Sequence, residues 1–230
     1  MIKPEDLLID LESARIKSAR YVNNGKNIPS VTELLSFIDS SGLINWANRI
    51  GRQGIDNQEI LKTAAKFGTN THSAIEKYLK GEPPFVDNSA FKAFQRWWEG
   101  LNSANKVEIL GQEEPLISDY FAGTYDLLIS INDKPYLVDF KTSNSVGYKY
   151  FMQIAAYRYL LYIKKNINIQ GAIVLKLGKG PKPKFQEFAL DFDNPEHYCF
   201  IENCLRSFMG VVYTYHNTEN CKERFDSIFD

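Results

Sequence analysis

A stretch of alternating apolar and polar residues from Phe121 to Ser143 constrains the fold of this 230-residue chain most strongly. Two runs rich in β-branched and aromatic residues flank the turn-forming pair Asn132-Asp133, which predicts an antiparallel β-hairpin. With this pair at the tip, residue 126 faces residue 139, and residue 127 faces residue 138. Because side chains alternate between the faces of a strand, one face is predicted to be apolar. Its members are Tyr125, Leu127, Ile129, Tyr136, Val138 and Phe140.

The polar face of this hairpin carries two carboxylates and an amine. Asp126 is predicted to lie across from Asp139, about 5 Å away at Cβ, with Lys141 two residues further on the same side. Two carboxylates this close favour a cation, and Mg²⁺ and Mn²⁺ bind through one or two carboxylates together with phosphate oxygens. Lys141 could orient or deprotonate a water and balance charge on a phosphate. The same spacing is equally typical of an exposed hairpin face with solvated charges.

The composition is that of a globular chain with 44% hydrophobic and 24% charged residues. A formal net charge of -1 gives no global attraction to nucleic acid, so such binding has to come from local patches. Cys199, Cys204 and Cys221 form no CxxC pair, which suits a reducing compartment. No apolar run reaches the length of a signal sequence or a membrane span. A cytoplasmic protein without membrane contact is therefore predicted.

The remaining pattern predicts helices, a mixed β-sheet, a helix, two more strands and a final helix. Helices are expected over 7–19, 31–37, 43–50, 58–79, 89–101, 147–163 and 195–215, and strands over 107–110, 115–118, 171–177 and 185–190. A second, small hairpin is expected over 20–28, Gly68 is expected to bend or interrupt its helix, and a polar tail follows residue 215. The order predicts an α/β fold. A helical region, 1–105, is expected to pack on a core, 106–230, as one compact unit.

Several of these segments resemble the RecB-like branch of the PD-(D/E)XK nuclease superfamily. They are Gly-Thr-Tyr-Asp at 123 to 126, Asp-Phe-Lys-Thr-Ser at 139 to 143, and Gln153 with Tyr157 on one face of the next helix. The resemblance implies a restriction-endonuclease-like core, with a central mixed β-sheet flanked by helices and an N-terminal helical extension. It implies that Asp126, Asp139 and the Phe140 backbone carbonyl bind a metal and that Lys141 is catalytic. Substrate-binding roles fall on Gln153, Tyr157, Lys149 and Thr142.

The resemblance extends upstream of the hairpin. Residues 67 to 76, FGTNTHSAIE, match a GxxxH pattern that implies His72 as a further metal ligand, although a lone helix histidine is more often structural. Glu113 is the implied strand carboxylate. Glu114 competes with it, because a slip of one residue reverses the face of a strand. Glu76, one turn after His72, is either near the metal or a charge on the helix surface.

Residues 28 to 32, IPSVT, resemble the opening segment of phage exonucleases and of the mitochondrial genome maintenance exonuclease. Ser30 and Thr32 could donate hydrogen bonds to a phosphate. Ser30 with Glu33 equally forms a helix-capping box that needs no ligand. Many relatives carry four cysteines that hold an iron–sulfur cluster, whereas this chain has three, so no cluster is predicted.

Together these features predict a nuclease that uses Mg²⁺ or Mn²⁺. The leading hypothesis is a DNA exonuclease that acts on single strands or DNA ends in the cytoplasm of a microbial or phage-infected cell. A structure-selective endonuclease and a non-catalytic DNA-binding protein are the alternatives. Four lysines could follow a phosphate backbone, or simply be solvated: Lys176, Lys179, Lys182 and Lys184. Three aromatic residues could stack bases, but their helical spacing favours a core: Phe91, Trp97 and Trp98.

Overall fold

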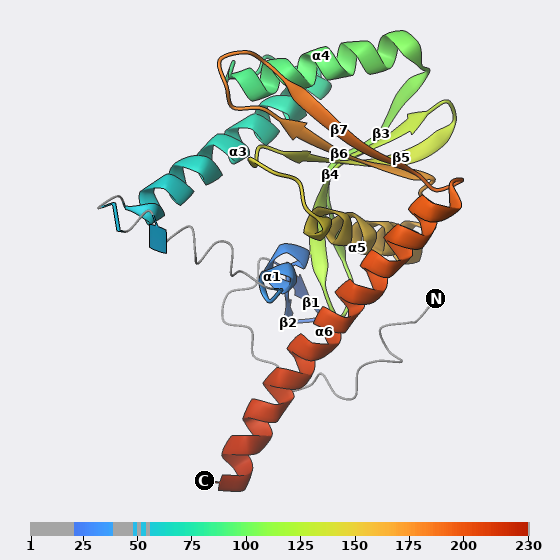
Figure 1. The fold of residues 1–230 in the computed structure, drawn as a ribbon. Helices are drawn as coiled ribbons and strands as arrows, with labels where there is room; N and C mark the ends of the chain where they lie inside the picture. Colours follow the sequence, from blue (N-terminus) through green and yellow to red (C-terminus); the bar gives the residue numbers. More distant parts are fainter. Residues whose placement is uncertain (1–20, 39–47, 50–51, 54–55, 230) are drawn as a thin grey trace.

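The computed structural model describes residues 21–38, 48–49, 52–53 and 56–229 (Figure 1). Its helices are α1 (Val31–Ser36), α3 (Asn57–Leu79), α4 (Ser89–Ala104), α5 (Tyr148–Lys165) and α6 (Pro195–Phe229). Its strands are β1 (Tyr21–Asn23), β2 (Lys26–Ile28), β3 (Val107–Ile117), β4 (Ala122–Ile131), β5 (Lys134–Lys141), β6 (Gly171–Leu177) and β7 (Phe185–Asp191). The helix expected over 7–19, and all but 48–49 of the helix expected over 43–50, lie outside the described residues.

A mixed five-stranded sheet forms the centre of the molecule. Its strand order is β3-β4-β5-β6-β7, and only β5 and β6 run parallel, because α5 connects them as a crossover. Helices α5 and α6 cover one face of the sheet, and α3 and α4 lie on the other (Figure 1). The predicted α/β fold with helices flanking a mixed sheet is confirmed.

The central hairpin forms as predicted from its turn residues. Asn132 and Asp133 both have positive φ, 51° and 66°, which suits a two-residue hairpin turn. Leu127 pairs with Val138, as predicted, whereas the ladder ends at this pair and does not include the predicted pair of residues 126 and 139. The small hairpin of β1 and β2 is confirmed as well.

The prediction for Tyr125 is wrong. Leu127 packs in the apolar cluster beneath α3 and α4, whereas Tyr125 packs in the opposite cluster, beneath α5. The ladder between β4 and β5 ends at Leu127, and on the other side of β4 the register places Glu113, with φ of 49°, across from Asp126. This local distortion interrupts the alternation of side chains between residues 125 and 127.

Two elements, β3 and α3, differ from the predictions for physical reasons. β3 is one strand rather than two, because it absorbs its Gly-Gln-Glu-Glu-Pro segment through a bulge between Ile109 and Gly111. Pro115 is tolerated because β3 is an edge strand. Gly68 lies inside an uninterrupted α3, where an added Cβ would be 3.3 Å from Thr142 Oγ1.

Helix α6 continues past the predicted end at residue 215 and reaches Phe229. Its buried residues end at His216, so the distal turns extend away from the body (Figure 1). The apolar spacing in the sequence therefore reports where packing ends, not where the helix ends. The three cysteines all lie on this helix. Among the described residues, no helix has the length and apolarity needed to cross a membrane.

Candidate active site

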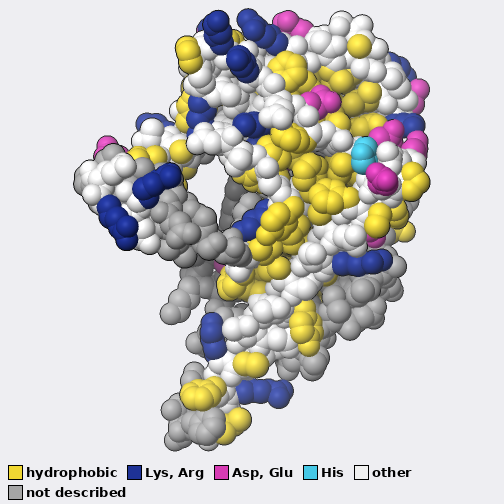
Figure 2. Space-filling model, viewed as in Figure 1, with side chains coloured by type: hydrophobic (Ala, Val, Ile, Leu, Met, Phe, Trp, Pro, Cys, Tyr) yellow, Lys and Arg dark blue, Asp and Glu magenta, His cyan; other side chains and the backbone are white. Residues whose placement is uncertain are grey.

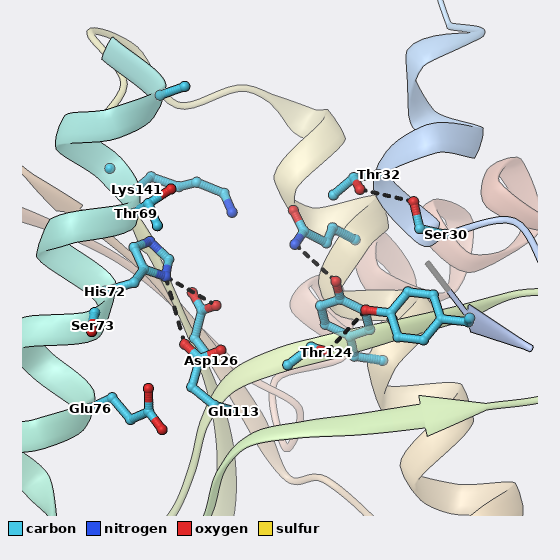
Figure 3. Close-up of a pocket in the computed structure, with 16 residues that line it drawn as sticks. Ser30, Thr32, Thr69, His72, Ser73, Glu76, Glu113, Thr124, Asp126 and Lys141 are labelled. Carbon is cyan, nitrogen blue, oxygen red and sulfur yellow. Dashed lines mark hydrogen bonds and ion pairs between the residues drawn. The ribbon is translucent and has the colours of Figure 1, made fainter. Parts of the chain in front are cut away.

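A cavity of about 850 Å³ opens between α3 and the N-terminal part of β4, with α5 and α1 on its far side (Figure 3). We call the side that carries ionisable groups the charged wall; it comprises His72, Glu76, Glu113, Asp126 and Lys141. We call the opposite side the hydroxyl wall; it comprises Tyr21, Ser30, Thr32, Thr124, Gln153 and Tyr157. The cavity thus brings together parts of the chain that are far apart in sequence.

Three residues of the charged wall form a potential metal-binding group. One ligand atom from each of His72, Glu113 and Asp126 lies within 4.8 Å of the other two. His72 Nδ1 is 3.4 Å from an Asp126 oxygen and 3.9 Å from a Glu113 oxygen. Ligands next to each other around an octahedral ion with bonds of about 2.1 Å are separated by about 3 Å, so a small inward movement would accommodate Mg²⁺ or Mn²⁺.

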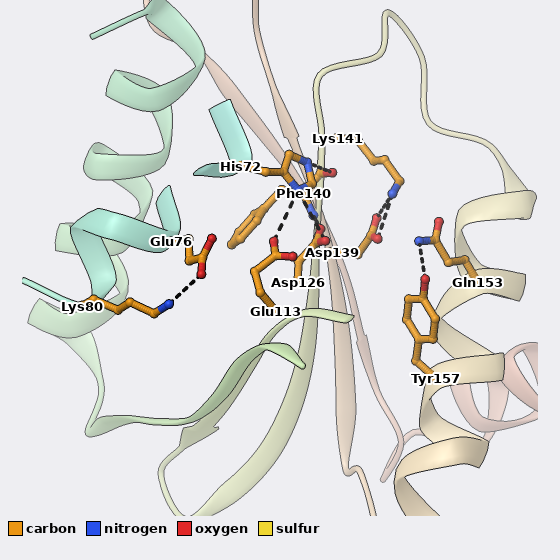
Figure 4. A network of polar contacts seen from close by, with 10 residues as sticks. All are labelled: His72, Glu76, Lys80, Glu113, Asp126, Asp139, Phe140, Lys141, Gln153 and Tyr157. Atoms are coloured by element: carbon orange, nitrogen blue, oxygen red, sulfur yellow. Dashed lines mark hydrogen bonds and ion pairs between the residues drawn. The ribbon is translucent and has the colours of Figure 1, made fainter. Parts of the chain in front are cut away.

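The backbone of β5 fixes both His72 and Asp126. His72 Nε2 lies 3.1 Å from the Phe140 carbonyl oxygen, which favours a proton on Nε2 and turns Nδ1 toward the carboxylates (Figure 4). Asp126 accepts a hydrogen bond of 2.7 Å from the Phe140 amide, at the point where β4 leaves β5. The backbone carbonyl of Phe140 therefore orients His72, and the backbone amide of the same residue orients Asp126.

Lys141, on the charged wall, is held by a buried carboxylate. Its Nζ is 2.8 Å and 2.7 Å from the two oxygens of Asp139, whose side chain is 3% exposed. The Tyr150 ring lies beneath the same ammonium, at 4.9 Å from Nζ to the ring centroid. Lys141 lines the cavity, whereas Asp139 lies behind it.

Charge coupling dominates the titration of these groups. Burial alone would lower the pKa of His72, but Asp126 and Glu113 raise it to about 10. Burial likewise opposes the charge on Lys141, yet Asp139 and Asp126 raise its pKa above the ordinary value. Burial raises the pKa of Asp139 to about 6, although Lys141 counteracts it. Imidazolium and ammonium together carry two positive charges against three carboxylates, those of Glu113, Asp126 and Asp139. His72 Nδ1 faces two of these carboxylates, which indicates that a cation and the His72 proton are alternatives.

The hydroxyl wall consists of neutral hydrogen-bonded pairs. Tyr21 and Thr124 hydroxyls lie 2.9 Å apart, although the two residues are separated by 103 positions in the chain. Gln153 Nε2 donates to the Tyr157 hydroxyl at 3.2 Å. Tyr157 packs against Gly123, where an added Cβ would lie 2.4 Å from the ring.

Ser30 and Thr32 complete this wall at the start of α1. Their hydroxyls lie 3.1 Å apart, and Ser30 Oγ accepts a hydrogen bond of 3.0 Å from the Glu33 amide. The reciprocal contact of the predicted capping box, from the Ser30 amide to Glu33, is also present. The capping box and the exposure of both hydroxyls to the cavity therefore coexist.

Other predicted site residues lie outside the cavity lining. Glu114 points away from the charged wall and pairs with Lys165. Lys149 donates to the Ile38 carbonyl at 2.7 Å, and Thr142 lies against α3 near Gly68. The Phe140 carbonyl contacts His72, as described above.

Sequence reasoning missed two residues of the hydroxyl wall. Thr124 is two positions before Asp126 within the Gly-Thr-Tyr-Asp segment, so strand alternation could have indicated it. Tyr21 reaches the cavity only because the β1–β2 hairpin packs beside the start of β4, where the Ala122 amide donates to the Pro29 carbonyl at 3.0 Å. No local pattern near Tyr21 indicates this contact.

Basic side chains gather on one exposed part of the molecule near α3 and α4. Figure 2 shows Lys and Arg side chains over the turn between β6 and β7 and the adjoining end of α4. Lys179, Lys182 and Lys184 are exposed in this turn. Lys179 Nζ lies 5.5 Å from the centroid of the Phe67 ring on α3, which joins the turn to the helix that carries His72.

Comparisons with known proteins give weak structural similarities. No family model matches the sequence, and the search of curated proteins finds no match. The crystal structure of SSO0001 aligns with a TM-score of 0.38 and 16% identity over 81% of this chain and 78% of that one. A phage-related exonuclease from Haemophilus somnus 129PT aligns with a TM-score of 0.34 and 11% identity, over 67% of this chain and 82% of that one. For an alkaline exonuclease from Laribacter hongkongensis the TM-score is 0.32, with 12% identity over 68% of this chain and 84% of that one.

Proposed function

We propose that this chain is a divalent-metal-dependent deoxyribonuclease that hydrolyses phosphodiester bonds, acting as an exonuclease on single-stranded DNA or DNA ends. One observation carries the proposal. The ligand atoms of His72, Glu113 and Asp126 converge beside a Lys141 ammonium that a buried carboxylate holds in place. Convergent oxygen and imidazole ligands beside a fixed ammonium meet the needs of phosphodiester hydrolysis.

In the proposed site, His72, Glu113 and Asp126 hold the cation. Asp139 and the Phe140 carbonyl are the further ligands, since each oxygen can accept more contacts than the one that Lys141 or His72 occupies. When bound, Mg²⁺ or Mn²⁺ supplies Lewis acidity and lowers the pKa of a water molecule. The contact between His72 Nε2 and Phe140 keeps Nδ1 directed at the carboxylates.

Lys141 has an electrostatic role in this proposal. Its raised pKa keeps the ammonium protonated, so it orients the attacking water and stabilises negative charge on the phosphate instead of removing a proton. The two contacts with Asp139 and the Tyr150 ring restrict the ammonium to one position. Four residues of the hydroxyl wall are proposed to contact the DNA strand: Gln153, Tyr157, Ser30 and Thr32. Lys149 and Thr142 are proposed to contact it from outside the cavity lining.

The test uses end-labelled single-stranded DNA incubated with Mg²⁺ or Mn²⁺. We expect shortened products that disappear with EDTA and fall by about 100-fold or more in Asp139→Asn and Lys141→Ala. Asp193→Asn is the matched control, because Asp193 pairs with Lys134 on the surface. Full activity in both site variants would refute the assignment.

Two further substrates separate the alternatives. A closed circular single strand is cut by an endonuclease but not by an exonuclease, so its survival supports the exonuclease proposal. The same sequence as RNA tests the preference for DNA, which is inferred from the resemblance of the motifs. Tight binding of DNA without cleavage under either metal would indicate the non-catalytic alternative.

A further inference from the structure

The hydroxyl wall is neutral, although it faces the charged wall across a single cavity. Its two central contacts are the Tyr21–Thr124 pair and the Gln153–Tyr157 pair, and they come from β1, β4 and α5. Figure 3 shows Thr124 on the side of the cavity opposite His72 and Glu76. The arrangement is built from residues distant in sequence, and the known chemistry of a metal site does not require it.

The direction of the hydrogen bonds shows what this wall offers. Because the Gln153 amide donates to the Tyr157 oxygen, this contact does not use the proton of the Tyr157 hydroxyl. Burial raises the pKa of Tyr157, so that proton is retained. In the neighbouring pair either oxygen can be the donor. When Tyr21 donates, Thr124 keeps its own proton for an acceptor in the cavity.

An acceptor-only group fits such a wall best. The non-bridging oxygens of a phosphodiester accept hydrogen bonds and donate none, whereas the bases carry donors as well as acceptors. Both walls line one cavity, so a phosphate on the hydroxyl wall belongs to the same short stretch of strand as a phosphate at Lys141. Gly123 has no side chain, which lets the Tyr157 ring pack directly on β4 beside Thr124.

We propose that Thr124 and Tyr157 bind the phosphodiester next to the one that is cleaved, and that Tyr21 is a positioning residue that orients the Thr124 hydroxyl. This inference rests on the proposed nuclease function and adds a second phosphate subsite to it. The subsite is uncharged, so it binds the neighbouring phosphodiester through hydrogen bonds and not through ion pairs. A strand with a neighbouring linkage is then cleaved faster than one without it.

The test is a cycle that combines protein variants with modified strands. Single-stranded oligonucleotides carry one methylphosphonate, which replaces a charged oxygen by methyl, on either side of the linkage that is cleaved. For the wild type we expect kcat/KM to fall by about tenfold at one of the two positions, the size of a hydrogen bond to a charged group. In Thr124→Val and Tyr157→Phe the same modification should cost less than about threefold, because the contact is already lost.

Two controls separate a subsite from general damage. Thr214→Val removes a hydroxyl that donates to Gly210 on α6, far from the cavity, and should keep the full wild-type loss. Tyr21→Phe should only partly reduce the loss that the methylphosphonate causes, because Thr124 keeps its own hydroxyl. If the methylphosphonate costs Tyr21→Phe as much as it costs the wild type, the positioning role of Tyr21 is refuted.

The failures of the two proposals are distinguishable. Equal losses in the wild type and in both hydroxyl variants, at both positions, would overturn the subsite while leaving a nuclease that cuts unmodified DNA. If the wild type cuts no strand, fluorescence anisotropy with Ca²⁺ measures binding of the same oligonucleotides. If the methylphosphonate weakens binding by the wild type more than by Thr124→Val and Tyr157→Phe, the subsite is supported and the nuclease is rejected. If it weakens binding equally in all three proteins, both proposals are rejected.

Discussion

The charged wall and the hydroxyl wall of the cavity are both fixed by hydrogen bonds, but they differ in what can disturb them. His72, Asp126 and Lys141 depend on one another's charge, so a change in pH or in a single carboxylate affects all three. Thr124 and Tyr157 depend on neutral partners. Under the proposed function this difference gives a division of labour, in which one wall responds to cations and protons and the other binds a nucleic-acid strand over a wider range of pH.

The largest expected effect comes from neutralising Asp126. Asp126→Asn removes a charge that the His72 imidazole and the Phe140 amide both contact. We expect activity to fall by about 1000-fold and Mn²⁺ affinity to fall with it, measured by single-turnover cleavage and isothermal titration calorimetry. Asp193→Asn should change neither. Normal Mn²⁺ affinity in Asp126→Asn would mean that the charged wall is not the cation site.

The second prediction concerns competition between a proton and the cation at His72. The pKa of His72 is about 10, so near pH 7.5 the imidazole carries a proton that a bound cation must displace. Mn²⁺ affinity should therefore rise by about tenfold per pH unit as the pH increases toward 10. Calorimetry in two buffers of different ionisation enthalpy should report about one proton released per cation.

The matched variant for this measurement is His72→Gln. It should bind Mn²⁺ more weakly and release no proton at this step, because glutamine does not titrate. Thr124→Val should release the same proton as the wild type, since the hydroxyl wall does not share this charge. Proton release that is unchanged in His72→Gln would assign the titration to another residue.

A smaller effect is expected from crowding the hydroxyl wall. In Gly123→Ala the added Cβ would lie 2.4 Å from the Tyr157 ring, so the ring has to move and the contact with Gln153 is strained. Overpacking of this kind costs about 1–3 kcal/mol, which a fall in Tm and a rise in KM should report. Mn²⁺ affinity should stay unchanged. Gly180→Ala, with no atom within 4 Å of its added Cβ, is the control.

The smallest effect is expected from the basic turn, which lies outside both walls. Lys182→Gln should lower the slope of log binding constant against log salt by at most about 0.7, the amount for one phosphate contact with a single strand. Thr124→Val should weaken binding and leave this slope unchanged. A slope that changes in Thr124→Val would break the distinction between neutral and charged recognition. An unchanged slope in Lys182→Gln would mean that Lys182 contacts no phosphate and is simply solvated.

Local patterns predicted the hairpin because its physics is local. Asn132 and Asp133 adopt the positive φ values of a tight turn, and the turn fixes which residues pair. The orientation of Tyr125 was not predictable from alternation, because it depends on Glu113 across the sheet. Gly68 likewise predicted a bend or break in its helix. In the structure α3 is continuous, and the absence of a side chain at Gly68 lets α3 approach Thr142 closely.

The predicted site residues separate in the same way. His72 and Glu113 meet Asp126 in one cluster, although no spacing in the chain fixes their distance. Glu114 and Lys149 instead find partners in Lys165 and Ile38, which only the packing of α5 against its neighbours provides. Tyr21 is recognisable only after the fold has brought two distant segments together.

At Glu113 the requirements of stability and of the proposed activity conflict, because its φ is positive. An L-residue in this conformation costs about 1 kcal/mol or more, which glycine or asparagine largely avoids. Selection for stability alone would therefore favour Glu113→Gly or Glu113→Asn, and either change removes a carboxylate from the group with His72 and Asp126. A screen for thermostable variants of this chain should recover such substitutions as well-folded proteins that no longer form the proposed cation site.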